Sequence, residues 1–219
     1  MPRTTHPKPK RGRPVDPTLP ARRRDEILTA ATHFFAKHGY LNADIELLAQ
    51  DIGVGKGTIY RYFKNKEHLF RQALTRGLDE MHRLKALDAQ EGEDGVALLR
   101  RGITAYFTYF DQHPEIIELI VLERAELKGH GKPTYFVHRE QYLDPWRKRL
   151  LRLMASGEIR RMNVDTIISI IGMMMYGALV THPYMNSKGA LAANAQGVMD
   201  VVLNGILPSP HDQPQSPRA

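Results

Sequence analysis

The tetrapeptide Gly-Lys-Gly-Thr at residues 55–58 has the residue types and order that end a phosphate-binding loop. Such a loop also requires a glycine five positions before residue 55 and a strand in front of it. Gln50 occupies that position, and the segment before it has helical periodicity. No nucleophile–base pair and no paired carboxylates occur at a spacing that indicates catalysis. We therefore expect neither an ATPase nor any other enzyme, and no cofactor.

Composition argues against metal, disulfide and membrane chemistry. The chain has 219 residues, 42% of them apolar, and no cysteine, which excludes a disulfide framework and a thiolate zinc site. His130, His138 and His182 lie in separate segments without ligand spacing, so we expect no metal. The longest nearly apolar run, 167–180, is shorter than the roughly 20 residues of a membrane-spanning helix. We expect a soluble, cytoplasmic protein without a membrane partner.

Residues 44–63 predict two short helices joined by a tight turn. Ala49 allows the helices to cross closely, and Gly53 can adopt the left-handed backbone conformation of such a turn. The second helix is too short and too polar to be explained by its own packing. Its polar and amphipathic residues are Lys56, Thr58, Tyr60, Arg61 and Tyr62. A recognition helix in the major groove of DNA explains these residue types, because side chains near its N-terminus meet base edges while others bind phosphates.

The elements that position this segment have helical periodicity, and strand-like alternation does not occur. We predict helices at about 22–38, 45–52, 56–62, from Asn65 past Leu78, and at about 94–112, 114–127, 135–155, 164–182 and 190–206. Asp144-Pro145 predicts a kink or a restart within 135–155. The predicted fold class is all-α, with an N-terminal three-helix helix-turn-helix DNA-binding domain and a helical dimerisation and effector domain. The expected divisions are a disordered basic arm (1–20), the DNA-binding domain (21–66), the effector and dimerisation domain (67–207) and a disordered tail (208–219).

Residues 23–74 resemble the DNA-binding domain of the TetR (tetracycline repressor) transcriptional regulators. The matching residues are Ile27, Leu28, Ala30, Ala31, Phe35, Gly39, Tyr40, Ile45, Ala49, Gly53, Val54, Lys56, Gly57, Thr58, Ile59, Tyr60, Tyr62, Phe63, Lys66, Glu67 and Leu69. The resemblance implies that three N-terminal helices bind DNA, and that a divergent helical domain dimerises and holds an effector. Most members of the family repress transcription and release DNA when a small molecule binds.

The resemblance also implies DNA contacts at particular positions. Residues 56–58 would open the recognition helix, residues 60–62 would contact the DNA backbone or base edges, and Lys66 would bind a phosphate. The family usually has hydroxyl residues where this chain has Ala43 and Asp44, and often serine at Gly55, although Asp44 and Gly55 can still cap a helix. The positions assigned to DNA binding are Asp44, Gly55, Lys56, Gly57, Thr58, Tyr60, Arg61, Tyr62 and Lys66.

The N-terminal segment is a second candidate for DNA contact. Residues 1–24 carry eight Lys and Arg residues and one Asp, so they hold the whole net charge of +7. Arg11-Gly12-Arg13-Pro14 resembles the core of the AT-hook, a peptide that binds the minor groove, and Arg11 and Arg13 would enter the negative potential of A·T-rich DNA. Two alternatives remain open: non-specific attraction to phosphates, and a solvated tail without a partner.

Helices 167–180 and 191–206 are the two most apolar. A domain of this size does not supply enough other segments to bury their apolar side chains. In the resembled family the last two helices usually form a four-helix bundle with a second subunit, and paired half-sites on DNA fit a symmetric dimer. The alternative is that both helices belong to the core of one subunit. The residues predicted at the homodimer interface are Ile167, Ile171, Val198, Val202 and Ile206.

An effector pocket is predicted near Asp144-Pro145, where aromatic and methionine side chains could line an adaptable apolar cavity. The candidate residues are Tyr106, Phe110, Glu123, Tyr142, Trp146, Met174 and Tyr176. The same residue types also build an ordinary helical core, which is the alternative. The expected effector is a small molecule of apolar or aromatic character.

These patterns predict a homodimeric, sequence-specific transcriptional regulator, a repressor that a small molecule releases from its double-stranded DNA operator. Two other classes stay open. A nucleoid-type protein would bind DNA through the arm without sequence preference, and the ratio of specific to non-specific affinity distinguishes it. A helical ligand-binding or catalytic protein with a degenerate DNA-binding domain is the second, and the presence of Lys56, Tyr60, Tyr62 and Lys66 argues against it.

Overall fold

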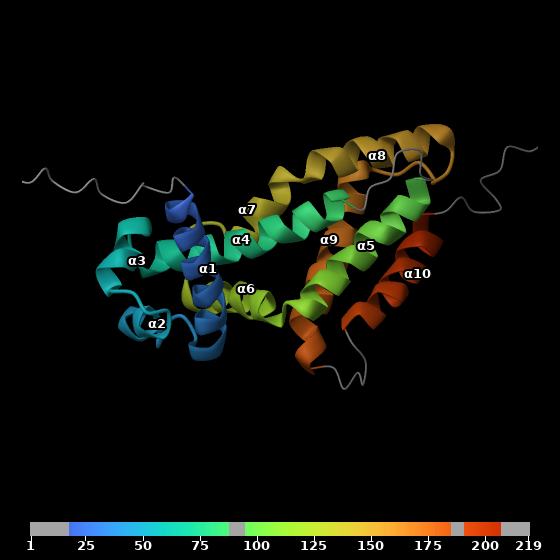
Figure 1. Ribbon diagram of the computed structural model, residues 1–219. Helices are drawn as coiled ribbons and strands as arrows, with labels where there is room; N and C mark the ends of the chain where they lie inside the picture. The colour runs from blue at the N-terminus through green and yellow to red at the C-terminus, as the bar shows by residue number, and fades with distance from the viewer. Residues whose placement is uncertain (1–17, 88–94, 185–190, 207–219) are drawn as a thin grey trace, which may run out of the picture.

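The computed structural model describes residues 18–87, 95–184 and 191–206, and these residues form helices and no strand (Figure 1). The all-α fold class is thereby confirmed. The α-helices are α1 (Leu19–His38), α2 (Ile45–Asp51), α3 (Lys56–Tyr62), α4 (Lys66–Leu87), α5 (Gly95–Gln112), α6 (Pro114–Glu126), α7 (Thr134–Gln141), α8 (Leu143–Ser156), α9 (Val164–Thr181) and α10 (Asn194–Ile206). Two short 3-10 helices, η1 (His182–Tyr184) and η2 (Leu191–Ala193), lie between α9 and α10.

Helices α1, α2 and α3 gather at one end of the molecule, and α4 runs from that end into its centre (Figure 1). Helix α1 packs on α4 and α6 through a buried apolar stripe that includes Ile27 and Phe35. The rings of Phe35 and Phe70 of α4 meet edge-on, with centroids 5.1 Å apart. Because α4 begins at Lys66, the domain boundary expected after residue 66 falls at the start of a helix that packs against both parts.

The residues predicted to start and stop helices explain several helix ends. Asp44 accepts a hydrogen bond from the backbone N–H of Glu46 at 2.8 Å. Asn65 accepts one from His68 at 2.7 Å, where α4 begins. Helix α3 has the predicted bounds, whereas α1 begins at Leu19 instead of near residue 22. Pro20 lies in the first turn of α1, where a missing N–H costs the helix nothing.

The predicted break within 135–155 is confirmed, but it lies at Tyr142 and not at Asp144. The N–H of Tyr142 donates to the carbonyl of Arg139 at 3.1 Å, which closes the last turn of α7. Helix α8 then starts at Leu143, so Asp144 lies in its first turn and does not cap it. Pro145 occupies the third helical position, where its absent N–H is among those that a helix start leaves unpaired.

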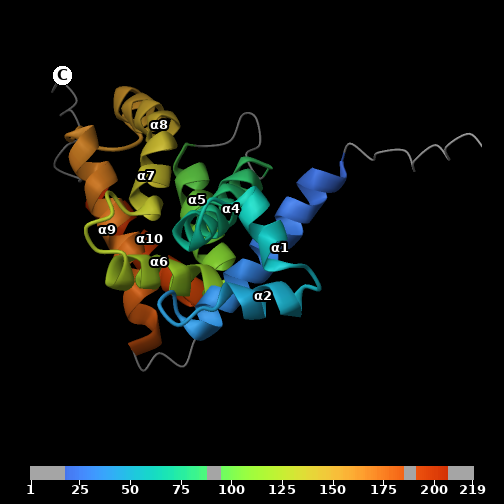
Figure 2. The same ribbon diagram turned by 90° about the vertical axis from the view of Figure 1, so that its left-hand side faces the viewer.

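The far end of the molecule is built from α5, α8, α9 and α10 (Figure 1). Helix α5 is central to it, with Tyr106, Phe107 and Phe110 buried and with contacts to α4, α6, α8, α9 and α10. Helix α9 lies on the side of the molecule opposite α1 (Figure 2). The buried residues of both ends form one continuous apolar core. A shift of packing at one end therefore has a direct physical route to the other.

Candidate nucleic-acid interface and ligand pocket

A small apolar cluster and a glycine turn hold the α2–α3 unit. Ile45, Leu48 and Ile59 are buried, and α2 contacts both α1 and α3. Between the two helices Gly53 has φ +65°, and the N–H of Val54 donates to a carbonyl of α2 at 2.9 Å. Residues other than glycine rarely adopt this backbone conformation. The turn predicted from the sequence is therefore present, and it fixes the angle at which α3 leaves α2.

Helix α3 turns most of its residues toward solvent. Within it only Ile59 is buried. Of the predicted DNA-binding residues of α3 and its N-cap, Gly55, Lys56, Gly57, Tyr60 and Arg61 are exposed, whereas Thr58 and Tyr62 are half-buried. Tyr60 is 40% exposed although it is aromatic. A short helix that presents Lys56, Tyr60 and Arg61 to solvent is suited to binding another molecule.

The charges on this face suit an anionic partner. The ammonium of Lys56 lies 3.6 Å from the carboxylate of Glu46, and both side chains are about half exposed. Exposed ion pairs of this kind are weak, so a DNA phosphate can replace the carboxylate at little cost. The guanidinium of Arg61 lies 5.8 Å from the ring centroid of Tyr62. Lys64, which sequence reasoning missed, adds an exposed cation directly after α3, and its position there was the available signal.

Lys66 has intramolecular partners. Its ammonium donates to the backbone carbonyls of Leu41 and Ala43, at 3.0 and 2.8 Å, and lies 5.0 Å from the ring centroid of Tyr40. These contacts tie the segment between α1 and α2 to the start of α4. Arg11 and Arg13, the predicted minor-groove residues, lie outside the described residues.

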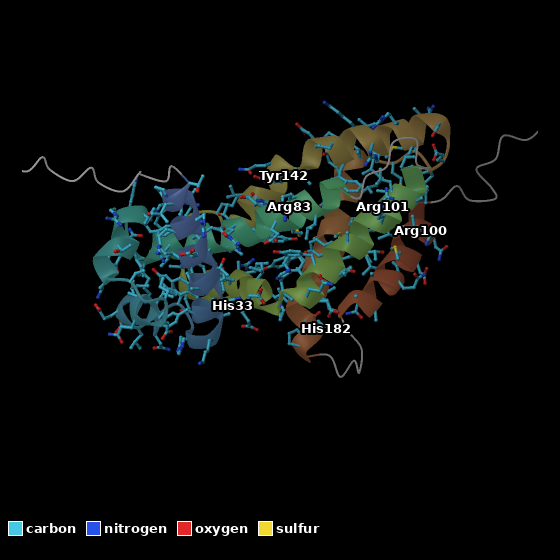
Figure 3. All side chains as sticks on the ribbon, viewed as in Figure 1. His33, Arg83, Arg100, Arg101, Tyr142 and His182 are labelled. Atoms are coloured by element: carbon cyan, nitrogen blue, oxygen red, sulfur yellow. The ribbon has the colours of Figure 1, made fainter. Side chains whose placement is uncertain are left out.

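A cavity of about 130 Å³ lies between α4, α5, α7, α8 and α9. Its lining is mainly apolar and includes Leu99, Ile103 and Leu150. Three of the predicted effector residues line it, namely Tyr106, Tyr142 and Trp146. Figure 3 shows Tyr142 where α7 meets α8. The helix break therefore coincides with the cavity wall, as the sequence suggested.

Four other predicted pocket residues do not line this cavity, which corrects their assignment. They are Phe110, Glu123, Met174 and Tyr176. Phe110 is fully buried in the core, and the ring of Tyr176 packs against those of Tyr135 and Phe136. The Glu123 carboxylate is bound by Arg71 and Thr134. Periodicity could not separate them from pocket residues, because core and cavity use the same residue types.

The polar groups of the cavity wall come mostly from α7, and among them Arg139 was missed by sequence reasoning. The hydroxyl of Tyr135 lies 2.8 Å from that of Tyr106, and burial raises the pKa of both phenols. The Nε2 atom of His138 lies 2.7 Å from the carboxylate of Asp79. Arg139 also lines the cavity. The helical spacing of 135, 138, 139 and 142 was the signal that could have placed them on one wall.

Three of the five predicted dimer residues have a place inside the subunit. Ile167 and Val202 are buried within the subunit, and Ile171 lines the cavity, so these three serve the subunit's own packing. Val198 is half-buried, and the side chain of Ile206 lies outside the described residues. The large apolar side chains that α9 and α10 expose are different ones: Ile170, Met173 and Val201. By length and composition alone, α9 is also apolar enough to cross a membrane.

Comparison with known proteins agrees with this geometry. Residues 27–73 match the family of bacterial regulatory proteins named tetR. A curated relative, the uncharacterized helix-turn-helix regulator YerO of Bacillus subtilis, is 25% identical over 189 residues, which are 84% of this chain and 63% of the relative. The chain thus spans less than two thirds of that protein. The fatty acid metabolism regulator protein of the same organism is 27% identical over 191 residues, covering 83% of this chain and 94% of the relative.

A solved structure has the same fold. The transcriptional regulator FadR from Bacillus subtilis, in complex with stearoyl-CoA, superposes with a TM-score of 0.72 at 22% identity, covering 83% of this chain and 98% of the other. The α2–α3 unit and the match over residues 27–73 together define a helix-turn-helix DNA-binding domain. Within that class of domain, residues 27–73 belong to the TetR family.

Proposed function

We propose that this protein is a homodimeric, cytoplasmic repressor that binds a specific operator and releases it when a small apolar effector enters the cavity. The exposed cationic and phenolic face of α3 carries the proposal, because this face has no packing role in the subunit. Family membership supports DNA binding as its purpose. The function is regulation and not catalysis.

In this proposal α3 enters the major groove. Lys56, Tyr60 and Arg61 point outward for phosphates and base edges, with Thr58 and Tyr62 beside them. The missing side chains of Gly55 and Gly57 let the start of the helix approach the DNA backbone closely, since nothing lies within 4 Å of either position. Asp44 holds the start of α2, and Lys66 is available to a phosphate only if it gives up its carbonyl contacts. Arg11 and Arg13 would reach the adjacent minor groove.

Dimerisation through α9 and α10 completes the proposal. These helices contact each other, and their exposed apolar side chains include Met173, 63% exposed, and Val201, 64% exposed. Burying such side chains against a second copy is favourable at about 25 cal/mol per Å² of apolar surface. A symmetric dimer also places two recognition helices on two half-sites, about one helical turn of DNA apart.

The cavity is the proposed effector site. Its lining is mainly apolar, and its wall includes the first turns of α8, next to the break at Tyr142. A relative is named for fatty acid metabolism, and a structural neighbour holds stearoyl-CoA. Both support an effector with a hydrocarbon part in this chain.

The test is a titration of the purified protein onto the intergenic DNA upstream of its own gene, with excess random duplex as competitor. We expect a protected site that survives competition. Tyr60→Ala should weaken this binding by about 10- to 100-fold, since a base contact contributes about 1–3 kcal/mol. Leu151→Ala truncates a similarly exposed apolar side chain on α8 and should leave binding unchanged.

Two results would reject the proposal. Binding that is lost equally to every competitor would make the protein a non-specific DNA binder. Operator affinity that Tyr60→Ala leaves unchanged, with the fold intact by circular dichroism, would mean that α3 is not the recognition helix.

A further inference from the structure

The cavity wall holds a cation that no carboxylate of the described residues neutralises. Arg139 of α7 lines the cavity, and its guanidinium donates to the backbone carbonyl of Ile168 at 2.9 Å. No ion pair joins it to a described Asp or Glu. The other basic groups of the wall are engaged differently: His138 contacts Asp79, and the ring of His82 stacks on that of Tyr142 at 3.7 Å.

The guanidinium occupies space that a glycine leaves open. Gly172 of α9 also lines the cavity, and a Cβ atom at that position would overlap the Nη2, Cζ and Nε atoms of Arg139. Any larger residue at 172 would therefore push the guanidinium aside. The packing of α7 on α9 thus includes a fitted position for this charge.

Two phenol groups lie within electrostatic reach of the same charge. Tyr106 and Tyr135 share a hydroxyl contact at the wall of the cavity. Burial raises the pKa of both, and the positive charge of Arg139 acts in the opposite direction on each. The guanidinium and the two hydroxyls thus form one polar corner in a mainly apolar cavity.

Arg139 is half-buried in a mainly apolar wall, where a charge without a paired anion is costly. The guanidinium has five N–H donors in a planar fork, which matches the two oxygens of a carboxylate. One backbone carbonyl uses only part of that capacity. An apolar ligand with a carboxylate at one end would both fill the cavity and neutralise the positive charge of Arg139.

We propose that the effector is an apolar monocarboxylate whose carboxylate pairs with Arg139 while its hydrocarbon part lies along Leu99, Ile103 and Leu150. The inference rests on the proposed function in that it takes this cavity as the effector site. It goes further by naming the chemical class of the effector and the residue that selects it. A thioester of the same chain lacks the carboxylate and should not use Arg139 in this way.

The test compares decanoate with decanol, two probes of equal chain length that differ in charge. Trp146 is the only tryptophan and lines the cavity, so its fluorescence reports binding. Decanoate should bind at least about tenfold more tightly than decanol, because hydrogen bonds to charged groups contribute about 1.5–3 kcal/mol. Arg139→Gln should remove that preference and leave decanol binding unchanged. Arg160→Gln, an exposed arginine outside the cavity lining, is the matched control.

A second variant tests the same contact in case Arg139→Gln fails to fold. Gly172→Ala keeps the charge and displaces the guanidinium, so it should also lower the preference for decanoate. Equal affinities for the two probes, a preference that survives Arg139→Gln, or no binding of either probe would overturn the inference.

Measuring the release of operator DNA distinguishes a failure of the monocarboxylate assignment from a failure of the proposed repressor function. If stearoyl-CoA releases DNA while decanoate shows no dependence on Arg139, the repressor function stands and the monocarboxylate assignment falls. If decanoate binds through Arg139 but no cavity ligand changes operator affinity, the ligand class stands and effector release falls.

Discussion

The side chain of Lys66 was predicted to bind DNA, but its contacts within the protein give it a structural role. Its ammonium donates to two backbone carbonyls in front of α2, and its burial lowers its pKa while Glu126 and Asp44 act to raise it. The same Glu126 accepts a hydrogen bond from the N–H of Leu41 at 2.7 Å. Lys66 therefore fixes the segment between α1 and α2, whatever it does with DNA.

Lys66→Met should lower the free energy of unfolding by about 1–2 kcal/mol, because two charge-assisted hydrogen bonds of a partly exposed group are lost. Urea unfolding followed by circular dichroism measures this change. The slope of log affinity for DNA against log salt should stay the same. Unchanged stability together with a slope that falls by about one would instead make Lys66 a phosphate ligand.

Buried tyrosines predict how the fold responds to alkali. Burial raises the pKa of Tyr106, Tyr109 and Tyr135, and Tyr109 donates to the carbonyl of Gly77 at 2.6 Å. A phenol that binds its proton more tightly when folded stabilises the fold fully below its unfolded pKa of about 10. Stability should therefore fall as the pH rises above about 10.

The measurement is absorbance at the phenolate band during a pH titration, with chemical unfolding at each pH. Tyr106, Tyr109 and Tyr135 should ionise only as the protein unfolds. Ionisation of all tyrosines in one step near pH 10, with stability constant, would contradict the assignment.

At the scale of the elements, a polar network joins the DNA-binding end to the wall of the cavity. Arg71 of α4 donates to Glu67 at 2.9 Å and to Glu123 of α6 at 2.5 Å. Glu123 is 3% exposed and also accepts hydrogen bonds from the N–H and hydroxyl of Thr134, at 2.8 and 2.7 Å. Thr134 is the first residue of α7, the helix that carries Tyr135 into the cavity wall. A ligand that moves α7 therefore acts on α4 through one carboxylate.

A double-mutant cycle of Arg71→Gln and Glu123→Gln should give a coupling energy of about 1–3 kcal/mol, because removing either partner strands a partly buried group. Equilibrium unfolding measures it. The exposed pair of Arg76 and Asp25 is the matched control and should couple by less than about 1 kcal/mol. Equal couplings for the two pairs would show that Glu123 is not a structural link.

How far the sequence determines these elements depends on how local each signal is. Helix α3 and the caps at Asp44 and Asn65 follow from neighbouring residues, so they were predictable. The wall of the cavity was only half predictable. Its polar groups depend on which side of α7 meets α5 and α9, and that choice is made by packing between distant segments.

The same reason explains the dimer residues. Ile167 and Val202 are as apolar as Met173 and Val201, and their periodicity in isolation does not say which face the subunit covers. The Arg71–Glu123 contact joins residues far apart in sequence and left no local pattern. The location of the charge, by contrast, could be determined directly from the sequence, since the net charge of +7 lies within residues 1–24.

For the whole molecule, the exposed apolar faces of α9 and α10 predict the oligomeric state. Met173→Glu should convert a dimer to a monomer, because the carboxylates of both copies would be buried near each other without partners. Light scattering after size exclusion measures the mass. Val137→Glu, which places the same charge on an exposed position of α7, should leave the dimer intact. A monomeric wild-type protein, or a Met173→Glu dimer of unchanged stability, would contradict the interface.

Sequence-specific DNA binding is tested by selecting the DNA that the wild-type protein binds from a pool of random duplexes, and by sequencing the bound fraction. We expect an enriched, roughly palindromic sequence whose half-site centres are about one helical turn, or a multiple of it, apart. Repeating the selection with Tyr60→Ala should remove the enrichment within the half-sites. A bound fraction with no enriched sequence would show that the protein does not read DNA sequence, and the repressor function would be abandoned.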